Sequence, residues 1–112
     1  MAKSSTGLDE NVAGALSYVL GIITGIVFFI LEKESDFVKF HAMQSIIVFA
    51  VLWIVSFILS YIPLIGWSLS LLVNLIAFVV WIVCIFKAYQ GEWFKLPVVG
   101  DIAEQQAKKM SA

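Results

Sequence analysis

Three long apolar runs, separated by short polar segments, dominate the chain. They cover about residues 11–31, 36–62 and 67–88. Each run has at least about 20 residues, the length with which an α-helix crosses roughly 30 Å of hydrocarbon. We therefore predict an all-α integral membrane bundle of three transmembrane helices.

Polar segments at the two ends complete a single domain. Residues 89–112 return to a polar composition, and Gly91 is a typical helix-ending residue. Asp101 suits the N-cap of a short amphipathic helix that ends near Lys109. The sequence thus predicts a polar tail over 1–10, a three-span bundle over 11–88 and an interfacial and cytoplasmic C-terminal tail over 89–112.

The composition favours a membrane protein and argues against other classes. Hydrophobic residues make up 62% of the chain and charged residues 13%, whereas typical soluble domains have about 45–50% and about 25%. The net charge of -1 argues against a nucleic-acid partner, which calls for a basic patch. The first run ends in FFILEKES without a small-residue cleavage site, so we interpret it as a retained span and not as a signal peptide.

Small residues recur along the first run. They form a stripe on one face of a continuous helix: Gly14, Ser17, Gly21 and Gly25. In lipid such a stripe lets another helix approach closely, so it indicates helix packing. The alternative is that these glycines are tolerated by chance.

Ser56 and Asn74 are polar residues at membrane depth. In a hairpin that turns at residues 63–66, the two positions lie level on neighbouring helices. A hydrogen bond between them would join the helices, with a strength of about 0.6 to 2 kcal/mol. The pair would otherwise line a polar path, since polar groups inside a membrane are often functional.

The lysines are distributed unevenly between the two sides of a three-span bundle. The N-terminal tail and the 63–66 turn would share one side, on which Lys3 is the one lysine. The other side would hold six: Lys33, Lys39, Lys87, Lys95, Lys108 and Lys109. The positive-inside rule then predicts that the 32–39 loop and the C-terminus are cytoplasmic and that the N-terminus is outside.

The segment FVKFHAMQS, residues 37–45, joins a charged loop to the second run and holds the one histidine of the chain. His41, Gln44 and Ser45 fall on one helix face at i, i+3 and i+4, while Phe37 and Phe40 suit anchoring at the membrane interface. Four interpretations are open. The polar residues cap a tail carbonyl or a loop carboxylate and bridge helices, line a pore or substrate path, sense protons, or bind a metal.

Nothing in the sequence indicates a reaction. A Ser–His–Asp triad would need Asp36, which points roughly away from His41 on a helix. Cys84 lies in an apolar run and suits a small buried hydrophobe, and no second histidine or cysteine lies near His41 to complete a metal site. We predict no enzyme activity, no catalytic residue, no metal, no cofactor and no identifiable small-molecule substrate.

FVKFHAMQS also resembles the signature of the Tic20-like, DUF4870 family of small integral membrane proteins. Three further segments match it: LGIITGIVFFILEKES, PLIGW and YQGEWFKLPVVGDIAE, so the resemblance covers about residues 12–106. It implies a small multi-span helical protein in the cell membrane of a prokaryote. By that analogy the positions to test are Phe37, Phe40, His41, Gln44 and Ser45.

Two functions are compatible with the sequence. Chloroplast members of that family are implicated in protein import, so the resemblance implies a transport- or protein-translocation-associated component that acts as an oligomer. The alternative is a non-transporting membrane scaffold or regulator that docks partners through its cytoplasmic loop and tail. In both cases the expected partners are the lipid bilayer and either further copies of the chain or other membrane proteins.

Overall fold

Helices make up the regular structure of the protein. The computed structural model describes residues 2–110, and within this range it has five helices and no strand. The helices are α1 (Glu10–Val19), α2 (Ile22–Leu31), α3 (Asp36–Leu59), α4 (Gly66–Tyr89) and α5 (Val99–Met110). The prediction of an all-α protein is confirmed.

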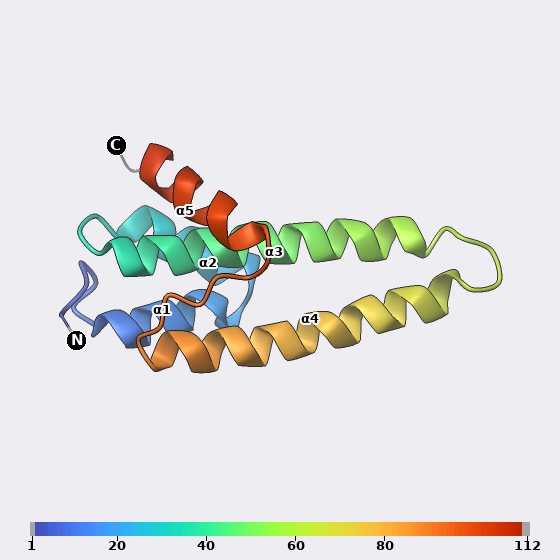
Figure 1. Ribbon diagram of the computed structural model, residues 1–112, viewed down its shortest axis with the longest axis horizontal. Helices are drawn as coiled ribbons and strands as arrows, with labels where there is room; N and C mark the ends of the chain where they lie inside the picture. The colour runs from blue at the N-terminus through green and yellow to red at the C-terminus, as the bar shows by residue number, and fades with distance from the viewer. Residues whose placement is uncertain (1, 111–112) are drawn as a thin grey trace.

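The helices α3 and α4 form a long antiparallel hairpin (Figure 1). Each has 24 residues, about 36 Å at 1.5 Å per residue, and both are apolar enough to cross a membrane. α3 ends at Leu59, three residues before the predicted limit, because the turn that contains Pro63 begins there. These two helices are the membrane-span candidates of the described residues.

The third transmembrane helix, predicted over 11–31, is not found. The run breaks at Leu20 and Gly21 into α1 and α2, each of ten residues and about 15 Å, which is too short to cross a bilayer. Gly21 has φ 62° and ψ −121°, a conformation that residues with a Cβ rarely adopt. The chain therefore turns back on itself, and α1 and α2 form a short hairpin beside α3 and α4 (Figure 1).

This hairpin changes the position of the N-terminal segment. We expected the N-terminal segment on the opposite side of the bundle from the 32–39 loop, and that expectation is wrong. The backbone N–H of Ser5 donates to the Glu32 carboxylate at 3.0 Å, so the two segments lie at the same end. The turn between α3 and α4 lies at the other end (Figure 1).

Burial divides the bundle into two halves. We call the part formed by α1, α2, α5 and the ends of α3 and α4 that contact them the five-helix half. In it, residues 37–45 of α3 are all buried, and Cys84 packs in the core as predicted for a small hydrophobe. We call the rest of the α3–α4 hairpin, around the 60–65 turn, the two-helix half. Most of its large apolar side chains are exposed, as expected for a surface that faces lipid.

The C-terminal tail returns to the five-helix half. Gly91, with φ 81°, follows the end of α4, and an extended segment leads to α5. α5 begins at Val99, two residues before the predicted cap, so that Asp101 lies in its first turn. Ala103 and Ala107 of α5 pack against α3, which places the predicted amphipathic helix on the bundle.

Candidate functional site

A chain of buried hydrogen bonds occupies the centre of the five-helix half. Tyr18, His41 and Gln44 are fully buried. The Gln44 amide donates to the Tyr18 hydroxyl at 2.8 Å, and that hydroxyl lies 2.7 Å from His41 Nδ1. His41 Nε2 lies 2.9 Å from the carbonyl oxygen of Glu92. A carbonyl only accepts, so Nε2 carries the hydrogen, and in the neutral ring Nδ1 accepts from Tyr18.

The side-chain amide of Gln44 binds the extended C-terminal segment through both its nitrogen and its oxygen. Gln44 Nε2 donates to the carbonyl oxygen of Phe94 at 2.9 Å, and the backbone N–H of Leu96 donates to Gln44 Oε1 at 3.0 Å. The segment belongs to no helix or strand, so its buried backbone groups need partners of another kind. His41 and Gln44 supply them, as the capping interpretation of these residues expects.

Ser45 and Trp81 hold the break between α1 and α2. Ser45 Oγ donates to the carbonyl oxygen of Gly21 at 2.9 Å, and Trp81 Nε1 donates to that of Tyr18 at 2.7 Å. Both carbonyls also accept from the backbone, that of Gly21 from the N–H of Gly25 in α2 and that of Tyr18 from the N–H of Gly21, each at 3.0 Å. Tyr18 and Trp81 were not among the predicted site residues, although a buried hydroxyl or indole N–H always needs a partner.

Phe37 and Phe40 do not anchor the protein at the membrane interface. They are buried, with ring centroids 4.5 Å and 4.9 Å from that of His41, and both also contact the ring of Trp93. The tail that folds over them removes them from lipid. Their role here is to enclose the imidazole in apolar surroundings.

The stripe of small residues is divided by the break in the first run. Gly14 and Gly25 lie close to α3: a Cβ would come within 2.9 Å of the Phe37 ring at the first and 3.0 Å of the Ala42 carbonyl oxygen at the second. Ser17 donates within α1, to the carbonyl oxygen of Ala13. Gly21 belongs to the turn and not to a helix face, so a single packing stripe is wrong because no continuous helix exists.

The predicted bond between Ser56 and Asn74 is not formed. Ser70 Oγ donates instead to the backbone carbonyl of Ser56 at 2.7 Å. Asn74, one turn after Ser70, lies at the edge of the same helix face and is exposed. Within residues 2–110, no group bonds the Asn74 carboxamide.

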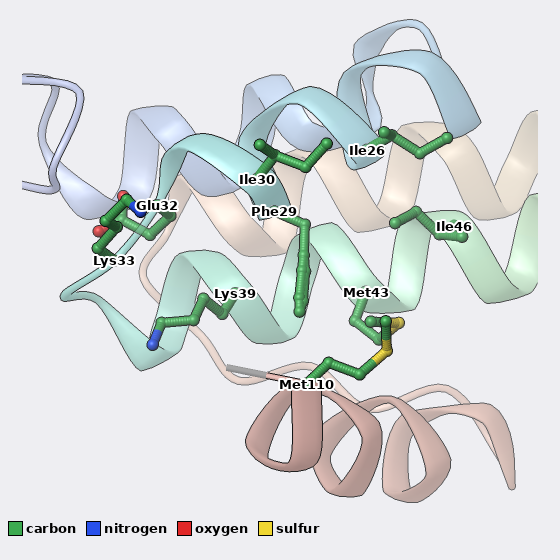
Figure 2. A pocket seen from close by; sticks show the side chains of 9 residues that line it. All are labelled: Ile26, Phe29, Ile30, Glu32, Lys33, Lys39, Met43, Ile46 and Met110. Atoms are coloured by element: carbon green, nitrogen blue, oxygen red, sulfur yellow. The ribbon is translucent and has the colours of Figure 1, made fainter. Parts of the chain in front are cut away.

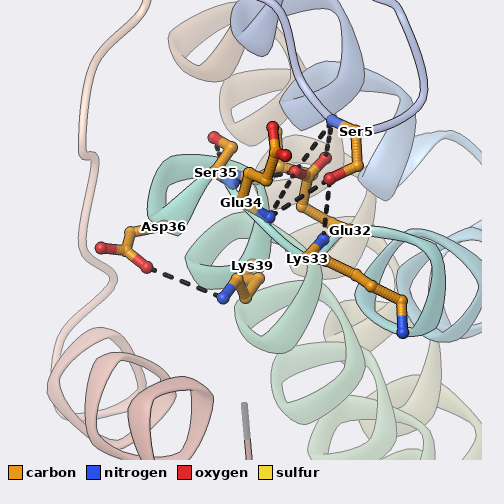
Figure 3. Close-up of polar contacts among 8 residues, drawn as sticks. Ser5, Glu32, Lys33, Glu34, Ser35, Asp36 and Lys39 are labelled. Carbon is orange, nitrogen blue, oxygen red and sulfur yellow. Dashed lines mark hydrogen bonds and ion pairs between the residues drawn. The ribbon is translucent and has the colours of Figure 1, made fainter. Parts of the chain in front are cut away.

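A second polar cluster fastens the N-terminal segment (Figure 3). The Glu32 carboxylate is buried and accepts from the backbone N–H groups of Ser35 at 2.8 Å, Ser5 at 3.0 Å and Glu34 at 3.2 Å. Burial raises the pKa of Glu32, but these donors outweigh burial and hold the pKa below its ordinary value. No sequence pattern predicts a buried carboxylate in a loop so rich in charge.

The polar side chains of both clusters bind backbone groups of the same chain. Every buried side-chain nitrogen and oxygen in the described residues has a hydrogen-bond partner. Residues 2–110 contain no group of three histidine, cysteine or acidic side chains arranged to hold a metal ion. The predicted site residues therefore hold two segments in place. His41 and Gln44 bind the C-terminal tail, and Ser45 binds the break between α1 and α2.

Comparison with known proteins identifies relatives over nearly the whole chain. The model of the magnetosome magnetite crystal formation protein family (MamF/MmsF) matches residues 8–103. A UPF0132 membrane protein of Methanocaldococcus jannaschii is 67% identical over 108 residues, which cover 96% of this chain and 97% of the relative. A UPF0132 membrane protein of Archaeoglobus fulgidus is 67% identical over 99 residues, which cover 88% and 96%. No solved structure matches the chain.

These relatives overturn the resemblance to the Tic20-like, DUF4870 family. The resemblance depended on FVKFHAMQS. The polar residues of this segment hold backbone segments in place here, and that requirement is not specific to one family. The protein-translocation role that it implied is not supported. The chain is a small membrane protein that belongs to the magnetosome magnetite crystal formation (MamF/MmsF, UPF0132) protein family.

Proposed function

We propose that this protein is a non-catalytic membrane scaffold that self-associates through the two-helix half. The observation behind the proposal is the exposed carboxamide of Asn74 on α4. The buried polar side chains of the five-helix half are engaged with the chain's own backbone, whereas this amide is left for a partner.

The position of Asn74 makes a second copy of the chain the natural partner. It lies eight residues after the start of α4, about 12 Å along the helix, and hence at membrane depth. Leu71 and Phe78, one turn away on either side, are exposed and apolar. An isolated amide in hydrocarbon is costly, and a carboxamide both donates and accepts, so two copies related by a twofold axis satisfy each other.

Replacing Asn74 with leucine should weaken self-association. An interhelical hydrogen bond in a membrane contributes about 0.6 to 2 kcal/mol, so we expect dimer dissociation to become roughly 3- to 30-fold easier. Subunit counting by single-molecule photobleaching in lipid bilayers, over a range of protein densities, measures this. Ser68→Leu, on an exposed face of α4 away from Asn74, is the matched control. Identical association of Asn74→Leu and the unmodified chain would contradict the proposal.

We further propose that the end of the five-helix half that carries the N-terminal segment and the 32–35 loop faces the cytoplasm. The N-terminal segment lies at the same end as the 32–35 loop, so all seven lysines of the chain belong to this half and the 60–65 turn has none. The positive-inside rule favours the cytoplasm for such an end, with the N-terminus inside.

Labelling from one side of the membrane tests this orientation. With buried Cys84 replaced by alanine, a cysteine at Lys3 should react with a membrane-impermeant maleimide only after the cells are opened. A cysteine at Tyr61, exposed in the turn, should react in intact cells. The reverse pattern would show the opposite orientation.

A further inference from the structure

A pocket lies between α2, α3 and the end of α5 (Figure 2). Apolar side chains line most of it, a part that we call its apolar length, and lysines lie at one end. Its volume is about 530 Å³. We propose that it binds one anionic phospholipid of the surrounding membrane, with a hydrocarbon chain along α2 and α3 and the phosphate at Lys33 and Lys39. This inference is independent of self-association, which involves the other half of the bundle.

The apolar length of the pocket is open to the membrane. Ile26 and Ile30 of α2 face Met43 and Ile46 of α3 across it. Ile30 is 70% exposed and Ile26 43%, so the pocket opens on a surface that water would not favour. Ile26 lies five residues before Leu31, the end of α2, which corresponds to roughly 8 Å of helix, and Lys33 follows in the loop, so the pocket has room for the upper part of a lipid chain.

Two lysines form the other end of the pocket (Figure 2). The Lys39 side chain is only 10% exposed, and its ammonium lies 3.8 Å from the carboxylate of Asp36, whose own side chain is 82% exposed. This is a long contact with a solvated partner, and it compensates the charge of a largely buried lysine side chain only weakly. Lys33 has no acidic partner among the described residues. A phosphate at this end would pair with the Lys39 ammonium, and the exposed Lys33 side chain, which points away from Lys39 in Figure 3, would turn toward the same anion.

Glu32 also lines the pocket, and its charge would oppose an anion. Its carboxylate, however, is already bound by the backbone N–H groups of Ser5, Glu34 and Ser35, as Figure 3 shows. These donors compensate the negative charge locally. The charge of the two lysines therefore remains available to an anion at the mouth of the pocket.

The combination of these features favours a lipid over a soluble anion. Free phosphate would use the lysines but leave the apolar length empty. A zwitterionic lipid such as phosphatidylcholine would fill the apolar length and bring a phosphate to the lysines, but its choline cation would oppose their positive charge. An anionic phospholipid matches both ends, and the two lie in the order that a bilayer imposes, with charge at the end of the helices and hydrocarbon deeper.

Native mass spectrometry of the full chain, released from vesicles of phosphatidylglycerol and phosphatidylcholine with identical chains, tests the proposal. We expect preferential retention of one phosphatidylglycerol. The double variant Lys33→Gln/Lys39→Gln should reduce that preference by about tenfold or more, given roughly 1 kcal/mol for each lysine. Lys109→Gln, an exposed lysine outside the pocket, should leave it unchanged.

A second variant tests the apolar length without touching a charge. Ile26→Trp should fill the pocket and abolish retention, whereas Ile23→Trp, on the same helix outside the pocket, should not. Both positions are exposed, so folding should persist. Equal retention of the two lipids, or retention that survives Ile26→Trp, would overturn the proposal. Complete displacement of phosphatidylglycerol by millimolar inorganic phosphate would overturn it too, since the site would then be one for a free anion.

Discussion

Replacing Gln44 with leucine should release the C-terminal segment from the bundle. The variant leaves the carbonyl of Phe94 and the N–H of Leu96 without their partners, and the Tyr18 hydroxyl loses a donor. Each unsatisfied buried group costs about 1–3 kcal/mol, so we expect the free energy of unfolding to fall by about 3 kcal/mol. Hydrogen exchange at the Leu96 amide, together with thermal unfolding in detergent, measures both effects.

A matched glutamine separates this effect from a general change in polarity. Gln105 lies on the exposed face of α5, so Gln105→Leu should change neither the exchange at Leu96 nor the unfolding temperature. In Gln44→Glu the buried carboxyl group should stay protonated, which keeps an acceptor for Leu96 and one O–H where the amide had two N–H groups, so this variant should fall between the two. Wild-type protection of the Leu96 amide in Gln44→Leu would mean that the tail is held by other contacts.

Replacing Gly21 with leucine should destabilise the break between α1 and α2. A side chain at φ 62° and ψ −121° is strained, and we expect a loss of about 2–3 kcal/mol. Crowding is a minor cause, because the nearest atom to an added Cβ is 3.7 Å away, on Phe49. Thermal unfolding of the variant in detergent is the measurement.

Leu20→Ala is the control for Gly21→Leu. Leu20 precedes Gly21, is 63% exposed and has an ordinary backbone conformation with φ −106°, so its truncation should have little effect. An unchanged unfolding temperature in Gly21→Leu would show that the turn tolerates a side chain. The strain assigned to this position would then be wrong.

Both predictions concern segments that neighbouring residues of α3 hold in place. Gln44 holds the tail and Ser45, the next residue, holds the carbonyl of Gly21. α3 thus holds both the extended C-terminal segment and the turn between α1 and α2. The segment 37–45, which holds the one histidine, is the point at which the five-helix half is closed.

The sequence by itself determined the features that depend on local composition. The long apolar runs were enough to predict α3 and α4, because length and hydropathy are properties of one segment. The helical period was enough to place His41, Gln44 and Ser45 on one face, because that geometry is the same in every α-helix. Both inferences needed no knowledge of neighbouring segments.

Only the tertiary structure decided where the chain turns and which polar groups meet. Glycine is common in membrane helices, so Gly21 could equally have continued the helix. The break is held by Ser45 and Trp81, from two other helices, which donate to the carbonyls of Gly21 and Tyr18 on either side of it. The packing of α4 against α3 likewise brings Ser70 to the Ser56 carbonyl and leaves Asn74, one turn further on, exposed at the edge of that face, which a level pairing in a hairpin does not reveal. Such outcomes depend on contacts between distant segments, and no local pattern contains them.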